Sequence, residues 1–110
     1  MVLRNESGIE MAYSKKLPLI SENEFLLKAK QISQFISPNQ KRYEVVRIQG
    51  DEMVFNRLDA KGSEPWKMNL KDVYKAYSEL TSFETENFRP YLTRTHSPAR
   101  ALLLKLGLIG

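Results

Sequence analysis

The sequence predicts a small α+β domain in which about three helices pack a three-stranded antiparallel meander, in the order α-β-β-β-α-α. Two observations lead to this fold class. Residues 22–36 and 70–80 repeat apolar side chains at helical spacing, whereas residues 43–58 alternate around a glycine turn as strands do. The chain has 110 residues, a length that one domain accommodates. We expect residues 1–20 to form an N-terminal arm and residues 21–110 to form that single domain.

The first predicted helix covers about residues 22–36. Ser21 precedes it as a candidate N-cap, and Glu24 follows three residues later, as in a capping box. Pro38 ends the helix, because proline disfavours helical backbone in the residue before it. The apolar positions that recur at helical spacing are Phe25, Ala29, Ile32 and Ile36.

Residues 41–59 predict a β-hairpin. Gly50 and Asp51 supply a two-residue turn, with glycine at the first central position as in a type II′ turn. Folding about this turn sets four pairs opposite each other, namely Gln49 with Glu52, Ile48 with Met53, Val46 with Phe55, and Glu44 with Arg57. Because successive side chains of a strand point to opposite faces, one face of the hairpin is apolar. We expect that face to pack against the helices, and it consists of Val46, Ile48, Met53 and Phe55.

A short third strand and a second helix follow the hairpin. Trp66 and Met68 lie on one side of the predicted strand at residues 66–69. Asn69 is a preferred N-cap residue and is expected to begin the helix. The apolar face of this helix consists of Leu70, Val73, Tyr74, Tyr77 and Leu80.

The last predicted helix begins with Ser97 as N-cap and Pro98 at its first position, and it ends before Gly107 at C′. It is apolar on nearly every side, which is typical of a helix buried on more than one side. It is therefore either the centre of the core or part of a contact with another chain. In the second case we expect a homodimer or partner interface through Leu103 or Leu104.

The formal net charge is +4, and the charge is unevenly distributed along the chain. No Asp or Glu follows Glu86, whereas four basic residues do: Arg89, Arg94, Arg100 and Lys105. Those four charges equal the net charge of the whole chain. An anionic partner such as nucleic acid should therefore be attracted first to the last quarter of the chain.

The start of the last helix is the strongest candidate binding site. Unpaired backbone N–H groups and the helix dipole favour an anion there, and a guanidinium group can bind two phosphate oxygens at once. The predicted anion- or nucleic-acid-binding residues are Arg89, Arg94, His96, Ser97, Arg100 and Lys105. The alternative is that Ser97 and Pro98 only start the helix, while the arginines are solvated or paired with Glu84 and Glu86.

The composition argues against most enzyme chemistry. The chain has no cysteine, one histidine and only three aspartates, which excludes thiolate sites and most metal clusters. Its five glycines are scattered singly and form no phosphate-binding loop. We therefore expect a non-enzymatic binding module, without cofactor or metal, that contacts nucleic-acid phosphates. The alternative function is a protein-interaction module or homodimer that associates through the leucine-rich helix.

The sequence also allows a prediction of the cellular location of the chain. No apolar run approaches the roughly 20 residues that a membrane span requires. The opening residues, MVLRNESGIEMAYSKK, contain no apolar segment of the kind found in secretory signals. The absence of cysteine suits a reducing compartment. We expect no membrane association and a cytoplasmic location.

Overall fold

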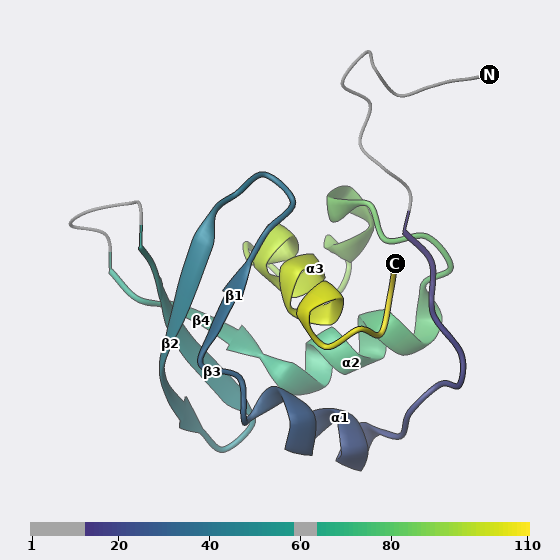
Figure 1. The fold of residues 1–110 in the computed structure, drawn as a ribbon, viewed down its shortest axis with the longest axis horizontal. Helices are drawn as coiled ribbons and strands as arrows, with labels where there is room; N and C mark the ends of the chain where they lie inside the picture. The colour runs from purple at the N-terminus through teal and green to yellow at the C-terminus, as the bar shows by residue number, and fades with distance from the viewer. Residues whose placement is uncertain (1–12, 59–63) are drawn as a thin grey trace.

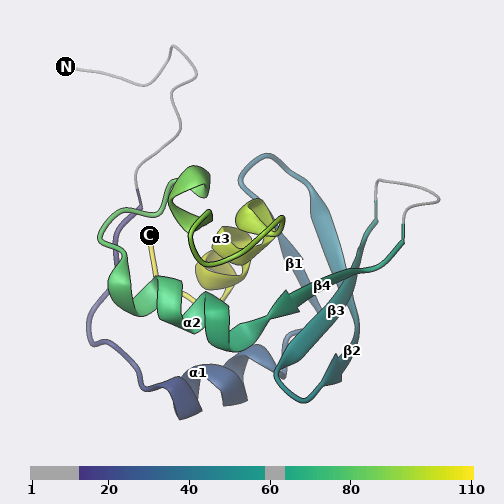
Figure 2. The same cartoon turned by 180° about the vertical axis from the view of Figure 1, so that it is seen from behind.

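The computed structural model of the chain describes residues 13–58 and 64–110. Their strands form one antiparallel sheet in the order β1-β2-β3-β4, and the helices lie together on one side of it (Figures 1 and 2). The elements are α1 (Glu22–Ala29), β1 (Gln34–Ile36), β2 (Arg42–Gln49), β3 (Glu52–Arg57), β4 (Trp66–Asn69), α2 (Leu70–Glu79), the 3-10 helix η1 (Thr85–Phe88) and α3 (His96–Lys105). The α+β class with an antiparallel sheet is therefore confirmed, but the sheet has four strands rather than three.

The additional strand comes from the second half of the first predicted helix. The start of that helix is confirmed, because Ser21 Oγ accepts a hydrogen bond from Glu24 N at 3.2 Å. The helix ends at Ala29, however, and β1 pairs with β2 instead of continuing it. The Phe35 ring stacks on Tyr43 with centroids 5.1 Å apart and meets Phe55 edge-on at 5.7 Å. These aromatic contacts across the sheet outweigh the weak helical period of residues 32–36.

The hairpin turn agrees with the prediction, and so do the pairs nearest to it. Gly50 has a positive φ of 61°, and Ile48 lies opposite Met53. Beyond those pairs a β-bulge at Val46 shifts the register by one residue. The side chain of Val46 is consequently 46% exposed, so its predicted place in the core is wrong.

The bulge also changes which residues face the core farther along the hairpin. Val45, rather than Val46, lies opposite Phe55. The predicted pair of Glu44 with Arg57 is likewise wrong, because Tyr43 occupies the place opposite Arg57. Tyr43 is buried as a result, and its ring meets Phe55 edge-on at 5.6 Å.

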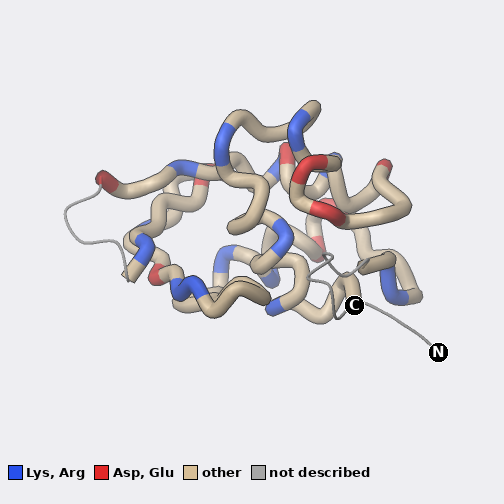
Figure 3. Tube along the Cα trace, turned by 90° about the horizontal axis from the view of Figure 1, so that it is seen from above, with Lys and Arg blue, Asp and Glu red and all other residues tan. Residues whose placement is uncertain are grey.

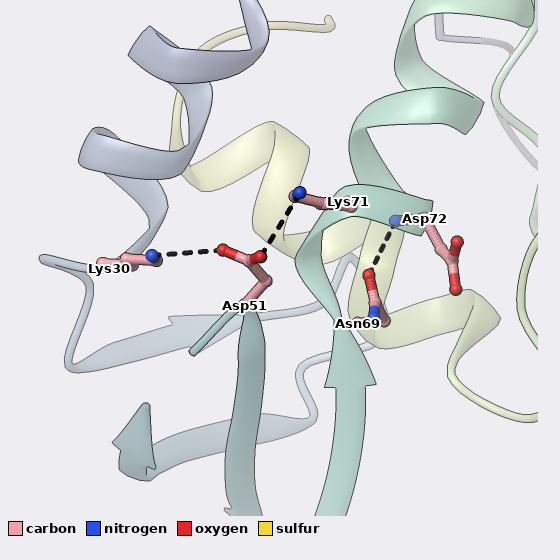
Figure 4. A network of polar contacts seen from close by, with 5 residues as sticks. All are labelled: Lys30, Asp51, Asn69, Lys71 and Asp72. Carbon is pink, nitrogen blue, oxygen red and sulfur yellow. Dashed lines mark hydrogen bonds and ion pairs between the residues drawn. The ribbon is translucent and has the colours of Figure 1, made fainter. Parts of the chain in front are cut away.

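The third predicted strand and the second helix are confirmed as β4 and α2. Asn69 caps α2, since its Oδ1 accepts a hydrogen bond from Asp72 N at 3.0 Å. Asp51, in the hairpin turn, lies beside this helix start (Figure 4). Its carboxylate oxygens lie 3.2 Å from Lys30 Nζ and 3.6 Å from Lys71 Nζ. The turn is thus joined to the end of α1 and to the first turn of α2.

The helix α3 is the central helix of the core. It packs against β1 and η1, and six of its ten residues are buried. Met53, Phe55, Tyr77 and Leu102 share the core cluster as predicted, and Ile48 packs against it at the edge. None of the helices in the described part of the chain is long and apolar enough to cross a membrane.

The two ends of α3 differ in how well the sequence predicts them. Its N-cap is Thr95, so Ser97 lies inside the first turn and its predicted capping role is wrong. At the other end Gly107 has a φ of 74°, as expected for C′. Gly107 N donates to Leu104 O and Leu108 N to Leu103 O, each at 3.0 Å, which is the Schellman pattern.

The last residues return to the N-terminal segment. Ile109 forms an antiparallel bridge with Lys15, and hydrogen bonds run from Ser14 N to Gly110 O and back from Gly110 N to Ser14 O. Tyr13 O accepts a hydrogen bond from Phe83 N at 3.0 Å. Residues 13–16 are thereby attached to both the chain end and the segment before η1.

Candidate anion-binding pocket

A pocket of about 310 Å³ lies at the N-terminal end of α3. Its lining contains basic side chains from three parts of the fold, namely Lys41, Arg57, Arg94, His96 and Arg100. The other described residues that line it are Asn39, Tyr43, Trp66, Thr85, Ser97 and Pro98. None of the described lining residues is an Asp or a Glu. A pocket with this lining offers several hydrogen-bond donors of the kind that bind anions.

Four of the six predicted binding residues meet at this pocket. Arg94, His96, Ser97 and Arg100 all line it. Arg89 and Lys105 do not. Arg89 is an exposed residue that ends η1, and Lys105 is exposed at the opposite end of α3. The four basic residues of the C-terminal quarter therefore do not form one cluster, because only Arg94 and Arg100 line the pocket.

Lys41 and Arg57 are pocket residues that the sequence did not identify as part of the site. A tight turn presents Lys41, since Ser37 N donates to Lys41 O at 2.8 Å and Lys41 N donates to Ser37 Oγ at 3.2 Å. Arg57 lies opposite Tyr43 because of the bulge at Val46. Lys and Arg positions are spread over the whole trace rather than confined to the last quarter (Figure 3). The pocket therefore depends on tertiary structure and not on a local sequence motif.

His96 and Ser97 lie in the first turn of α3. His96 Nε2 is 2.7 Å from Leu92 O, and because a carbonyl oxygen can only accept, this nitrogen carries the proton. The other ring nitrogen, Nδ1, is an acceptor in the neutral ring and can donate to an anion only when the ring is protonated. Ser97 Oγ is buried and has no hydrogen-bond partner among the described residues. Its hydroxyl can therefore donate to a ligand that enters the pocket.

Arg94 and Arg100 differ in their surroundings. Arg94 is exposed and forms no ion pair with another described residue, so the predicted alternative pairing with Glu84 or Glu86 does not apply to it. Arg100 is only 2% exposed, and its Cζ lies 5.4 Å from the centroid of the Tyr13 ring. The ring face stabilises the guanidinium charge in this buried position. Arg94 is thus the accessible arginine, whereas Arg100 is a fixed charge in the pocket wall.

Tyr91 helps to hold the segment that leads to Arg94. Its hydroxyl donates a hydrogen bond to Glu79 Oε1 at 2.9 Å. This hydrogen bond raises the pKa of Tyr91, because only the neutral phenol can donate it and the phenolate would be repelled by the carboxylate. The neutral phenol joins this segment to the end of α2.

A second, larger hollow adjoins the basic pocket. It has a volume of about 700 Å³, and its described lining is Glu64, Pro65, Trp66, Lys67, Arg94 and Thr95. Trp66 and Arg94 line both hollows. Any ligand that extends from one hollow to the other would pass these two side chains.

The predicted interface leucines lie in different environments. Leu103 is 0% exposed and belongs to the core of its own chain, whereas Leu104 is only partly buried. This arrangement gives Leu103 no surface for a partner. Association through Leu104 stays a prediction, which light scattering over a range of concentrations would test.

Within the described residues no group of three or more His, Asp or Glu side chains could hold a metal ion. Comparison of the chain with protein-family models, with curated proteins and with solved structures gave no match.

Proposed function

We propose that this chain is a non-enzymatic binding module that contacts nucleic-acid phosphates through the pocket at the start of α3. The observation that carries this proposal is that the basic side chains of a loop, a strand and a helix converge on one pocket. Arg94, which is exposed, is the residue best placed to meet a phosphate first. Arg57, Lys41 and Arg100 add positive charge around it.

Phosphate suits this pocket for two reasons. A guanidinium group can donate two parallel hydrogen bonds to phosphate oxygens, and helix N-terminal N–H groups favour the same anion. Exposed charges are screened over about 8 Å at physiological salt. Binding should therefore be weak and should fall as salt rises, because each neutralised phosphate releases bound counterions.

The test is the salt dependence of binding, measured by the fluorescence anisotropy of a labelled DNA oligonucleotide. Arg94→Ala is compared with Lys105→Ala, which removes the same charge from an exposed position outside the pocket. We expect Arg94→Ala to reduce the slope of log affinity against log salt by roughly 0.7–0.9 for each phosphate that the variant no longer neutralises. The weakening should be alike for all base sequences, since phosphate contacts carry no sequence information.

Lys105→Ala should leave both the affinity and the slope close to those of the natural chain. If Arg94→Ala has the unchanged slope instead, the pocket is not the phosphate site. Equal weakening by the two substitutions would mean that only the overall charge of the chain attracts DNA.

A further inference from the structure

We infer that the nucleic acid is single-stranded and that one of its bases stacks on Trp66 while an adjacent phosphate contacts Arg94. This inference rests on the proposed function and adds the class of ligand. Its basis is that Trp66 and Arg94 line both hollows at the start of α3. A base and a phosphate of one nucleotide are joined through a single sugar, so neighbouring side chains can contact both.

The side chain of Trp66 is held in place by two other aromatic rings of the sheet. It lies opposite Phe55 in the pairing of β3 with β4, and their ring centroids are 5.9 Å apart at an interplanar angle of 61°. The Tyr43 ring lies 6.3 Å away on the same side of the sheet. Trp66 itself is only partly buried. The indole is therefore a fixed aromatic surface, part of which faces the two hollows.

Single-stranded nucleic acid is recognised by this combination of features. Aromatic side chains stack on the exposed faces of successive bases, and a positively charged groove follows the backbone. A base inside a duplex is already stacked on its neighbours and cannot reach a side chain without leaving the helix. The larger hollow is lined by the exposed Lys67 and Glu64, whose charges offset each other, so Arg94 is the phosphate contact next to Trp66.

The experiment compares three labelled DNA probes with the full chain. The first is an oligothymidylate of about eight nucleotides, a length within the range bound by small single-strand-binding folds. The second is an abasic strand of equal length, and the third is a hairpin whose stem is a duplex of that length. The abasic strand carries the phosphates without the bases. Trp66 is the sole tryptophan of the chain, so intrinsic tryptophan fluorescence reports on this residue alone.

We expect oligothymidylate to quench the fluorescence of Trp66 and to bind more tightly than the other two probes. The abasic strand should bind through its phosphates with little quenching. Equal affinity for oligothymidylate and the abasic strand, with no difference in quenching, would overturn stacking on Trp66 and leave the phosphate site intact. Failure of all three probes to bind at low salt would overturn both the inference and the proposed function.

Substitutions of Trp66 give an independent readout by anisotropy. Trp66→Leu should weaken the binding of oligothymidylate by about 5- to 150-fold and leave the binding of the abasic strand unchanged. Trp66→Phe keeps an aromatic ring and should weaken it less. Thermal unfolding shows whether each variant is folded. If Trp66→Leu does not fold, the comparison of the three probes on the natural chain still tests the inference. Similar weakening for both probes with a folded variant would argue against stacking.

Discussion

The guanidinium carbon of Arg100 lies 5.4 Å from the centroid of the Tyr13 ring, and this contact joins α3 to the N-terminal segment. Arg100 is 2% exposed, and the Tyr13 ring is partly buried against the core. The backbone of Tyr13 is fixed independently, because its carbonyl oxygen accepts a hydrogen bond from Phe83 N. The N-terminal segment is therefore packed against Arg100, one of the residues that line the pocket.

This relationship predicts that Tyr13 contributes to stability through its ring. Tyr13→Leu removes the aromatic face from a buried guanidinium and should lower the free energy of unfolding by about 0.5–2 kcal/mol. Tyr13→Phe keeps a ring at the same position and should cost less. Urea denaturation measures both changes, provided that the slope with urea concentration is unchanged. If Tyr13→Leu and Tyr13→Phe have the same midpoint, the ring does not stabilise Arg100.

Phe55 lies at the centre of the aromatic cluster of the sheet. It is 0% exposed, and its ring meets Phe35, Tyr43 and Trp66. Phe55→Ala should therefore lower the free energy of unfolding by roughly 3–5 kcal/mol, because it removes buried apolar surface and leaves a cavity. Leu58→Ala is the control on the same stretch of chain, since Leu58 is 41% exposed, and should cost about 1 kcal/mol or less. Comparable midpoints for the two variants in urea would contradict the burial of Phe55.

The bulge in β2 can be tested with one type of substitution at two positions. Val46 is 46% exposed, whereas Val54 is 0% exposed. Val46→Thr should change the free energy of unfolding by no more than about 0.5 kcal/mol. Val54→Thr places a hydroxyl in an apolar environment and should cost about 1–3 kcal/mol. In the regular hairpin expected from the sequence Val46 would lie in the core, and Val46→Thr would then also cost about 1–3 kcal/mol. Thermal or urea unfolding of the Val46→Thr variant therefore distinguishes the two registers, and Val54→Thr gives the cost at a buried valine of the same sheet.

The bulge also shows where prediction from the sequence ends. Strand alternation and the turn at Gly50 were sufficient for the first pairs of the hairpin, because those pairs depend on local geometry. An inserted residue such as Val46 leaves the alternating pattern readable in either register. The choice is made by the packing of Tyr43 and Phe35 in the aromatic cluster. The contact of Phe35 with Tyr43 depends on the pairing of β1 with β2, which the sequence did not predict.

The same distinction applies to the elements and to the pocket. Capping residues such as Ser21 and Asn69 were identified correctly because a cap needs only a few neighbouring residues. At the pocket, Arg94 was predicted from its place before the last helix. Lys41 and Arg57 were missed, since a turn and a shifted strand register bring them there. The residue next to the last helix could thus be predicted from the sequence, whereas the residues that the sheet and its turn contribute could not.

Arg94 and Arg100, two of the three arginines among the described lining residues, should separate binding from stability. Arg94 is exposed and forms no ion pair with another described residue, so Arg94→Ala should change the free energy of unfolding by no more than about 0.5 kcal/mol. The same variant should weaken the binding of a DNA oligonucleotide at low salt, because it lacks the accessible guanidinium that we propose contacts the phosphate.

Arg100→Ala, in contrast, should lower the free energy of unfolding. It removes a long side chain that is 2% exposed, together with the contact to Tyr13, and should cost about 2 kcal/mol or more, as truncation of large buried side chains does. Urea denaturation and DNA anisotropy on the same preparations measure the two properties. An Arg100→Ala variant as stable as the natural chain would show that Arg100 is not a structural part of the pocket wall. An Arg94→Ala variant that binds DNA normally would remove Arg94 from the site.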